Sequence, residues 1–131
     1  VRILPRGNFL DESGPVVQAA LPAFLPVPAP TGRPLDRRDL ADWIVHPRNP
    51  LTARTFVNRL WKQFFGVGLS RVLDDLGAQG EPPTHPEILD TLAVRFARDG
   101  WDVKRLVRTV VTSAAYRRTS VPTPAQRAAD P

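Results

Sequence analysis

Proline residues divide this chain into a segment that cannot be helical and a segment that can. Of the 15 prolines in 131 residues, six fall within residues 14–35. Because proline lacks a backbone N–H and fixes φ, a helix cannot run through this stretch. The stretch also holds Phe24 and Leu25, which a solvated linker would lack. We therefore expect an extended strap over residues 1–35 that packs its apolar side chains on a helical body.

The residues after the strap carry the start and stop signals of helices. Asp36 is a predicted N-cap for a helix over residues 37–45. Asn49–Pro50 fits the N-cap and first position of a second helix, and Gly66 is suited to end it. The apolar residues of this second helix recur as adjacent pairs every four residues, which predicts a wide buried stripe. They are Phe56, Val57, Leu60, Trp61, Phe64 and Phe65. We expect this helix to form the core.

Two further helices are predicted beyond a connector (residues 67–83) that is rich in glycine and proline. The sequence Thr84–Glu87 matches a T-x-x-E capping box with proline in the first turn, so a third helix should begin there. Gly100 would end this helix, and Asp102 would cap a fourth. The pattern therefore predicts an all-α fold, a compact bundle of about four helices.

The predicted organisation has three parts. They are the extended proline-rich strap (residues 1–35), a helical domain (residues 36–119) and a frayed tail (residues 120–131). The chain begins with a strand-like run from Val1 to Leu4 and lacks the long apolar stretch of a signal peptide there. We expect it to be the carboxyl-terminal part of a longer protein.

Composition excludes several kinds of site. The chain has no cysteine and no methionine, so it can form no disulfide, thiolate metal site or c-type haem attachment. His46 and His85 each precede a proline and show no metal-ligand spacing. No apolar run approaches the roughly 20 residues that a membrane-spanning helix needs. We expect no cofactor, no metal, no catalytic residue and no membrane span.

Asn58 and Arg59 interrupt the apolar stripe of the predicted core helix. In one interpretation they are a buried amide and guanidinium that tie down the backbone of the connector. In the other they form a polar site beneath the loop at residues 77–83, and an enzyme site could then include Asn58, Arg59, Glu81 and His85. Both interpretations stay open from the sequence.

The net charge of +5 is concentrated near the end of the chain. The basic residues there are Lys104, Arg105, Arg108, Arg117 and Arg118, with Asp102 as the acid among them. The short turn between the third and fourth helices permits a helix-turn-helix, which would bind nucleic acid through the fourth helix. Alternatively the arginines pair with Asp90 or Asp99 and contact proteins. We expect protein contacts rather than nucleic acid.

Eight separate blocks of residues 37–119 carry a family resemblance. They are Arg38–Ile44, Asn49–Arg54, Val57–Trp61, Phe65–Leu69, Asp75–Gly77, Gly80–Glu87, Gly100–Lys104 and Thr112–Arg117. In this order they resemble the planctomycete PSD-type domain, a domain of unknown function catalogued under the number 1553. The preceding Leu4–Gly7 is similar to the segment that comes before this domain in the family.

The resemblance implies a setting rather than an activity. Members of the family are large, apparently exported proteins, often with a cytochrome-c-like haem domain upstream, so an extracytoplasmic or periplasmic location is implied. The partners would then be neighbouring domains or other proteins. We expect a structural or protein-interaction module of a larger exported protein, with nucleic-acid binding and an enzyme site as the two alternatives.

Overall fold

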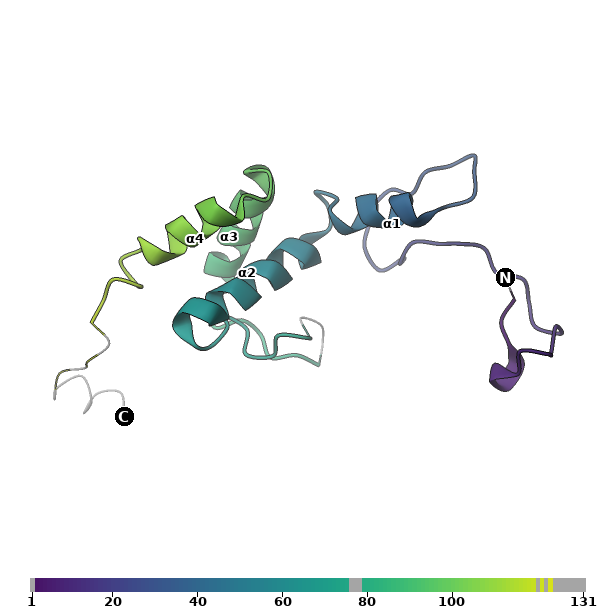
Figure 1. Cartoon of the computed structure of the whole chain (residues 1–131), viewed down its shortest axis with the longest axis horizontal. Coiled ribbons are helices and arrows are strands. Elements are labelled where there is room, and N and C mark those ends of the chain that lie inside the picture. The colour runs from purple at the N-terminus through teal and green to yellow at the C-terminus, as the bar shows by residue number, and fades with distance from the viewer. Residues whose placement is uncertain (1, 76–78, 120, 122, 124–131) are drawn as a thin grey trace. The chain divides into compact units, whose positions relative to one another are not determined.

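The computed structural model describes residues 2–75, 79–119, 121 and 123 (Figure 1). These residues form four α-helices and one short 3-10 turn, and no strand. The elements are η1 (Pro5–Gly7), α1 (Arg37–Ile44), α2 (Pro50–Phe65), α3 (Pro86–Arg98) and α4 (Val103–Val111). The predicted all-α fold class is confirmed. The chain divides into two compact units, Val1–Asn49 and Pro50–Pro131, and the predicted boundary after residue 35 stays a prediction.

The first unit holds α1, whose start is fixed by a capping box. The Asp36 carboxylate accepts from the backbone N–H of Arg38 and of Asp39, and the Asp39 carboxylate accepts from the backbone N–H of Asp36. Both terminal nitrogens of Arg33 donate to the Asp39 carboxylate, at 2.6 and 2.8 Å. The N-cap predicted at Asp36 is therefore confirmed, and Arg33 adds a bidentate clamp that ties the end of the strap to the helix.

This clamp makes the protonation of Asp39 a testable property. Hydrogen bonds from Arg33 and from the Asp36 backbone hold the pKa of Asp39 below its ordinary value of 3.8. A carboxyl with a lowered folded-state pKa stabilises the fold fully above the unfolded value, and this contribution is lost as pH falls through the folded value. We expect an NMR titration to place the Asp39 pKa below 3.8, and Arg33→Ala to move it back up. An unchanged pKa in the Arg33→Ala variant would contradict the clamp.

The strap is less buried than the sequence predicts. Near its beginning, Ile3 N–H donates to the Pro15 carbonyl at 3.0 Å, and Arg2 forms an isolated antiparallel bridge with Val16. Leu21, Leu25 and Val27 are half-buried. Val16 and Val17, however, are exposed, and Phe24 keeps 69% of its surface accessible.

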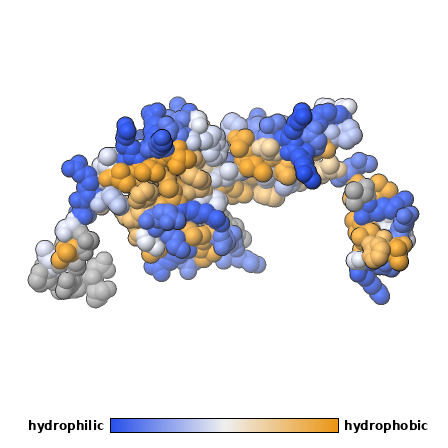
Figure 2. All heavy atoms as spheres, in the orientation of Figure 1, coloured by the Kyte–Doolittle hydropathy of each residue, from blue (hydrophilic) through white to orange (hydrophobic). Residues whose placement is uncertain are grey.

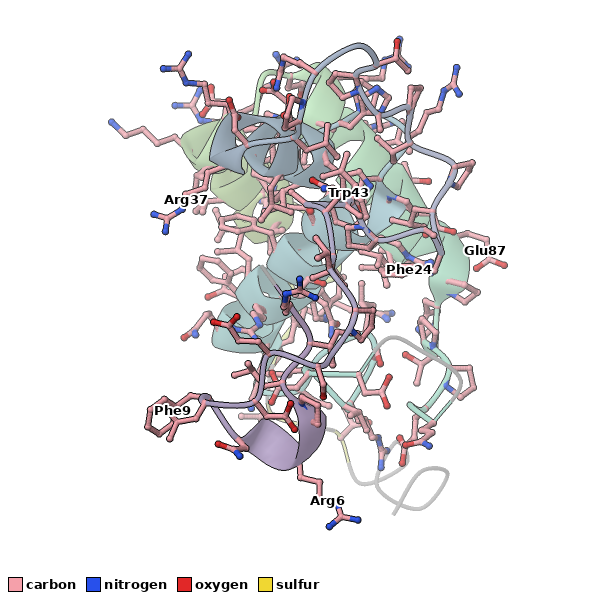
Figure 3. The ribbon with its side chains drawn as sticks, turned by 90° about the vertical axis from the view of Figure 1, so that its right-hand side faces the viewer. Arg6, Phe9, Phe24, Arg37, Trp43 and Glu87 are labelled. Atoms are coloured by element: carbon pink, nitrogen blue, oxygen red, sulfur yellow. The ribbon has the colours of Figure 1, made fainter. Side chains whose placement is uncertain are left out.

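Phe24 corrects the expectation that its ring is buried. The ring lies edge-on to Trp43 of α1, with ring centroids 5.9 Å apart, and Figure 3 shows the two side chains next to each other. An edge-on contact covers one side of a ring and leaves the other to solvent, which explains the exposure. Apolar side chains also lie at the surface around η1, where Phe9 is 77% exposed (Figures 2 and 3).

The second unit has a core built on α2. Helix α2 packs against α3 and α4, and α3 also contacts α4 (Figure 1). The buried core residues are Ala53, Val57, Leu69, Leu89, Ala93, Phe96 and Leu106, with Leu60, Trp61, Leu92 and Trp101 packed partly buried against them. The prediction that α2 is the core helix is confirmed, although its Phe56 lies at the edge of the core, stacked on Phe96.

The predicted capping box at Thr84 is wrong. Helix α3 has His85 as its N-cap residue, and no side chain caps it. The Thr84 backbone N–H and hydroxyl both donate to the Leu69 carbonyl, at 2.8 and 3.2 Å, so the hydroxyl is held by the connector and does not face the helix. Glu87 extends away from the start of α3 in Figure 3. Thr84 therefore fastens the end of the connector to its beginning.

Three other helix ends follow the sequence signals. Gly66 and Gly100 adopt φ of +79° and +71°, the left-handed conformation that ends helices. Asp102 accepts from the backbone N–H of Arg105 at 3.0 Å and caps α4 as predicted. Among the described residues, no helix is both long and apolar enough to cross a membrane.

Candidate functional site

Helix α4 separates its residues sharply into a buried side and a basic side. Leu106 and Val110 are buried, whereas Lys104, Arg105 and Arg108 are exposed. This arrangement follows from the spacing, since residues four apart lie on the same face of a helix and the basic residues fall between the apolar ones. The short α3–α4 turn holds α4 on the core through Trp101, whose backbone N–H donates to the Phe96 carbonyl at 3.0 Å.

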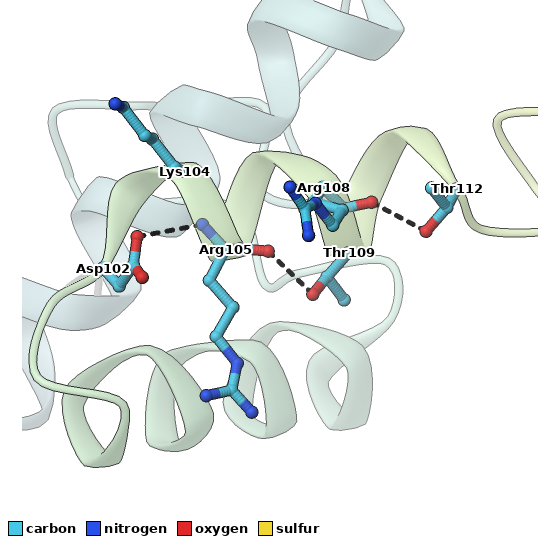
Figure 4. A pocket seen from close by; sticks show the side chains of 6 residues that line it. All are labelled: Asp102, Lys104, Arg105, Arg108, Thr109 and Thr112. Atoms are coloured by element: carbon cyan, nitrogen blue, oxygen red, sulfur yellow. Dashed lines mark hydrogen bonds between the residues drawn. The ribbon is translucent and has the colours of Figure 1, made fainter.

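An open hollow runs along the outward face of α4 (Figure 4). It has a volume of about 590 Å³ and is lined by Asp102, Lys104, Arg105, Arg108, Thr109 and Thr112. Figure 4 shows Lys104 and Arg105 extending to opposite sides of α4, with Arg108 farther along the helix. We call this surface the α4 hollow. Three cations and two hydroxyl groups therefore surround one open space.

The charges of the α4 hollow are only partly neutralised. Arg105 Nε lies 3.1 Å from Asp99 Oδ2, and one carboxylate oxygen of Asp102 accepts from the backbone N–H of Arg105 as the helix cap. No ion pair within the described residues joins Lys104 or Arg108 to a carboxylate. The hollow can therefore accept further negative charge at these two positions.

The two threonines contribute little donor capacity to the hollow. The Thr109 hydroxyl donates to the Arg105 carbonyl at 2.9 Å, and the Thr112 hydroxyl donates to the Arg108 carbonyl at 2.7 Å. A hydroxyl has a single proton to donate, so both groups face a ligand as acceptors. Any anion would be held by the cationic side chains alone.

Of the two predicted acidic partners for the basic cluster, the structure supports one. Asp99 pairs with Arg105, as expected. Asp90 instead pairs with Arg54 of α2, with Nε and Oδ1 2.9 Å apart but without hydrogen-bond geometry. The reason is that α3 packs on α2, which places its Asp90 beside Arg54. Arg117 and Arg118 lie beyond α4, are exposed, and do not line the hollow.

Asn58 is fully buried and ties the connector to α2. Its Nδ2 donates to the Ser70 carbonyl at 2.9 Å, and its Oδ1 accepts from the Ser70 backbone N–H at 3.0 Å. Of the two interpretations of Asn58, the structure therefore confirms the buried amide. Ser70 is itself fully buried, and its hydroxyl donates to the Glu81 carbonyl at 3.1 Å. Asn58 thus holds the beginning of the connector, and the Ser70 hydroxyl joins that beginning to its end.

Arg59 does not share this burial. Its side chain is 57% exposed and pairs with Asp74 at 2.7 Å, beside an open hollow of about 350 Å³. The interpretation of Arg59 as a buried guanidinium is therefore wrong. A helix turns about 100° per residue, so consecutive residues such as Asn58 and Arg59 point in different directions.

Glu81 and His85 are the other two residues of the enzyme site that the sequence suggested. Both side chains are exposed; the Glu81 backbone carbonyl accepts from Ser70, and His85 Nδ1 lies 3.2 Å from Thr84 Oγ1. No hydrogen bond or ion pair among the described residues joins the side chains of Asn58, Arg59, Glu81 and His85. Residues 77 and 78 of the loop predicted to cover them lie outside the described part of the chain. Where the chain is described, no three His, Asp or Glu residues gather as a metal-holding group.

Sequence reasoning missed Ser70 and Thr112. Ser70 has no local signal, because its partners Asn58 and Glu81 lie 12 and 11 residues away. Thr112 could have been found from helical spacing, since it lies four residues after Arg108 on the same face.

A comparison with known families gives a match. The family PSD1, described as a protein of unknown function (DUF1553), matches residues 36–131, which is most of the chain. No curated protein and no solved structure matches the chain.

Proposed function

This chain belongs to the PSD1 family of proteins of unknown function (DUF1553), and we propose that it is a protein-interaction module whose docking surface is the α4 hollow. The observation that carries the proposal is the open space between Lys104, Arg105 and Arg108, of which only Arg105 has a partner acid among the described residues. Arginine and lysine beside an open space suit contacts with carboxylates of another protein.

Two features of the α4 hollow favour a protein over nucleic acid. First, it contains the carboxylate of Asp102, and Asp99 stands beside Arg105, so the positive charge is confined to a short stretch and a long row of phosphates would extend past it onto these acids. Second, a recognition helix contacts bases and phosphates with polar side chains. The hydroxyls of Thr109 and Thr112 already donate to backbone carbonyls of α4 and cannot donate to a phosphate as well. Both features leave a surface that suits a few carboxylates of a protein better than a continuous row of phosphates.

We further propose that the module belongs to a larger exported protein, in an extracytoplasmic or periplasmic compartment. The support is the resemblance of residues 37–119 to the planctomycete PSD-type domain, whose members often carry a cytochrome-c-like haem domain. Reading the complete parent gene tests this part: an export signal and a haem-attachment motif upstream are the expected findings. A parent gene without an export signal would contradict it.

The docking proposal predicts weak, salt-sensitive binding of DNA. We expect duplex and single-stranded DNA to bind the chain only at low salt. At physiological salt, neither the parent nor the Arg105→Ala/Arg108→Ala double variant should bind DNA. Non-specific contacts with phosphates are lost steeply as salt rises, because they depend on counterion release. Fluorescence anisotropy at two salt concentrations measures this.

One outcome would overturn the docking proposal. Micromolar or tighter DNA binding at physiological salt, abolished in the double variant, would make α4 a recognition helix. Arg71→Ala is the matched control, because it removes one exposed cation from the connector, outside the α4 hollow.

A further inference from the structure

We infer that the α4 hollow binds an extended acidic segment of a partner protein, with carboxylates on alternate residues. The inference rests on the proposed function, because it names the partner of the same surface. Its starting point is the pair of cations, Lys104 and Arg108, that have no partner acid among the described residues. A bound segment would bring the missing carboxylates.

The spacing of the two cations fits an extended segment. Lys104 and Arg108 lie four residues apart on α4, which corresponds to a rise of about 6 Å at 1.5 Å per residue. In an extended chain, alternate side chains lie on one face about 6.8 Å apart, at 3.4 Å per residue. A Glu-x-Glu pattern therefore places its two carboxylates at nearly the separation of the two cations.

Asp99 does not line the hollow, but it shows how a carboxylate pairs with one of the hollow's cations. It already lies 3.1 Å from Arg105, and both side chains are partly exposed, so solvent and a ligand can reach the pair. An incoming carboxylate competes with Asp99 for Arg105. Asp99 therefore lowers the affinity of the hollow for acidic segments, and its removal should raise that affinity.

The arrangement in Figure 4 also gives the segment a path. Lys104 and Arg105 extend to opposite sides of α4, and Arg108 lies about one turn farther along the helix. A segment that runs along the helix from Lys104 to Arg108 leaves the Arg105 side chain to one side. We therefore expect Lys104 and Arg108 to contribute most of the affinity in the intact protein, and Arg105 to contribute more when Asp99 is absent.

The test uses two labelled peptides of the same composition with the whole chain. In one, Glu and Ser alternate; in the other, Glu-Glu pairs alternate with Ser-Ser pairs. Fluorescence anisotropy at low and physiological salt should show the alternating peptide binding at least about threefold more tightly, because only its glutamates all lie on one face when extended. Equal binding, or tighter binding of the paired peptide, would overturn the inference, since a helical ligand would bind the paired form at least as well.

Variants of the hollow sharpen the test. Lys104→Ala and Arg108→Ala should each weaken binding of the alternating peptide about fivefold, whereas Arg71→Ala should change it by less than about twofold. Asp99→Asn should tighten binding about two- to fivefold, the size expected for an exposed ion pair. A loss in Arg71→Ala as large as in Arg108→Ala, or no gain in Asp99→Asn, would overturn the inference. Far-UV circular dichroism confirms that each exposed substitution leaves the helices folded.

The two proposals can fail separately. Tight DNA binding that depends on Arg105 and Arg108 would remove the proposed function and this inference together. Weak DNA binding together with equal binding of the two peptides would remove only the inference, and would leave a docking surface for a different arrangement of carboxylates.

Discussion

Replacing Asn58 with alanine is expected to lower the free energy of unfolding by roughly 2–6 kcal/mol, because it leaves two buried backbone groups of Ser70 without partners at about 1–3 kcal/mol each. The Ser70 N–H and carbonyl now bond the Asn58 amide at 3.0 and 2.9 Å, and both residues are fully buried. Water cannot reach these groups unless the connector opens. Chemical denaturation followed by circular dichroism measures the loss.

Ser70→Ala is the matched control for this prediction. It removes only the hydroxyl that donates to the Glu81 carbonyl and keeps the backbone groups that bond Asn58. We expect it to cost about 0.5–1.5 kcal/mol, the net value of an ordinary hydrogen bond. If Asn58→Ala unfolded within a few tenths of a kcal/mol of the parent, the connector would not depend on this amide.

The close fit around Asn58 also explains the glycine at position 68. A Cβ placed on Gly68 would lie 2.8 Å from Asn58 Oδ1 and would collide with the Ser70 carbonyl oxygen. Any side chain there would push the backbone away from the amide. The glycine is therefore needed for the close approach of the connector to α2.

Phe96→Ala is the second large effect that we expect, at about 3–5 kcal/mol of unfolding free energy, as for other large aromatic deletions from a core. Phe96 of α3 is 3% exposed. Its ring stacks on Phe56 of α2 at 4.9 Å and meets Trp101 edge-on at 5.1 Å. Its removal leaves a cavity between α2, α3 and the turn before α4, and these three parts cannot all move in to fill it. Denaturant unfolding measures the cost.

Trp61→Ala offers a comparison within the same core. Trp61 stacks on Phe65 at 4.1 Å, and Phe65 meets Tyr116 edge-on at 5.6 Å, but Trp61 is only half-buried. Because solvent can enter the space that its ring leaves, we expect a smaller loss than for Phe96→Ala. A larger loss in Trp61→Ala would mean that the end of α2, rather than the α2–α3 contact, supplies most of the stability.

The features that the sequence predicted correctly depend on contacts within a few residues. Asp36 and Asp102 cap helices through the backbone N–H groups two or three positions later. Gly66 ends a helix because the next turn needs a left-handed residue. The basic face of α4 likewise follows from the spacing of Lys104 and Arg108 alone. Local geometry is sufficient in each of these cases.

The features that only the tertiary structure decided depend on residues brought together by packing. Thr84 fits a capping box by spacing, yet its N–H and hydroxyl bond Leu69, 15 residues earlier. Asn58 forms hydrogen bonds with Ser70, which lies 12 residues later, and Asp90 pairs with Arg54 because α3 lies on α2. A polar group has several possible partners in an unfolded chain. The one it bonds is set by which backbone the hydrophobic core places beside it, and the local sequence does not contain that information.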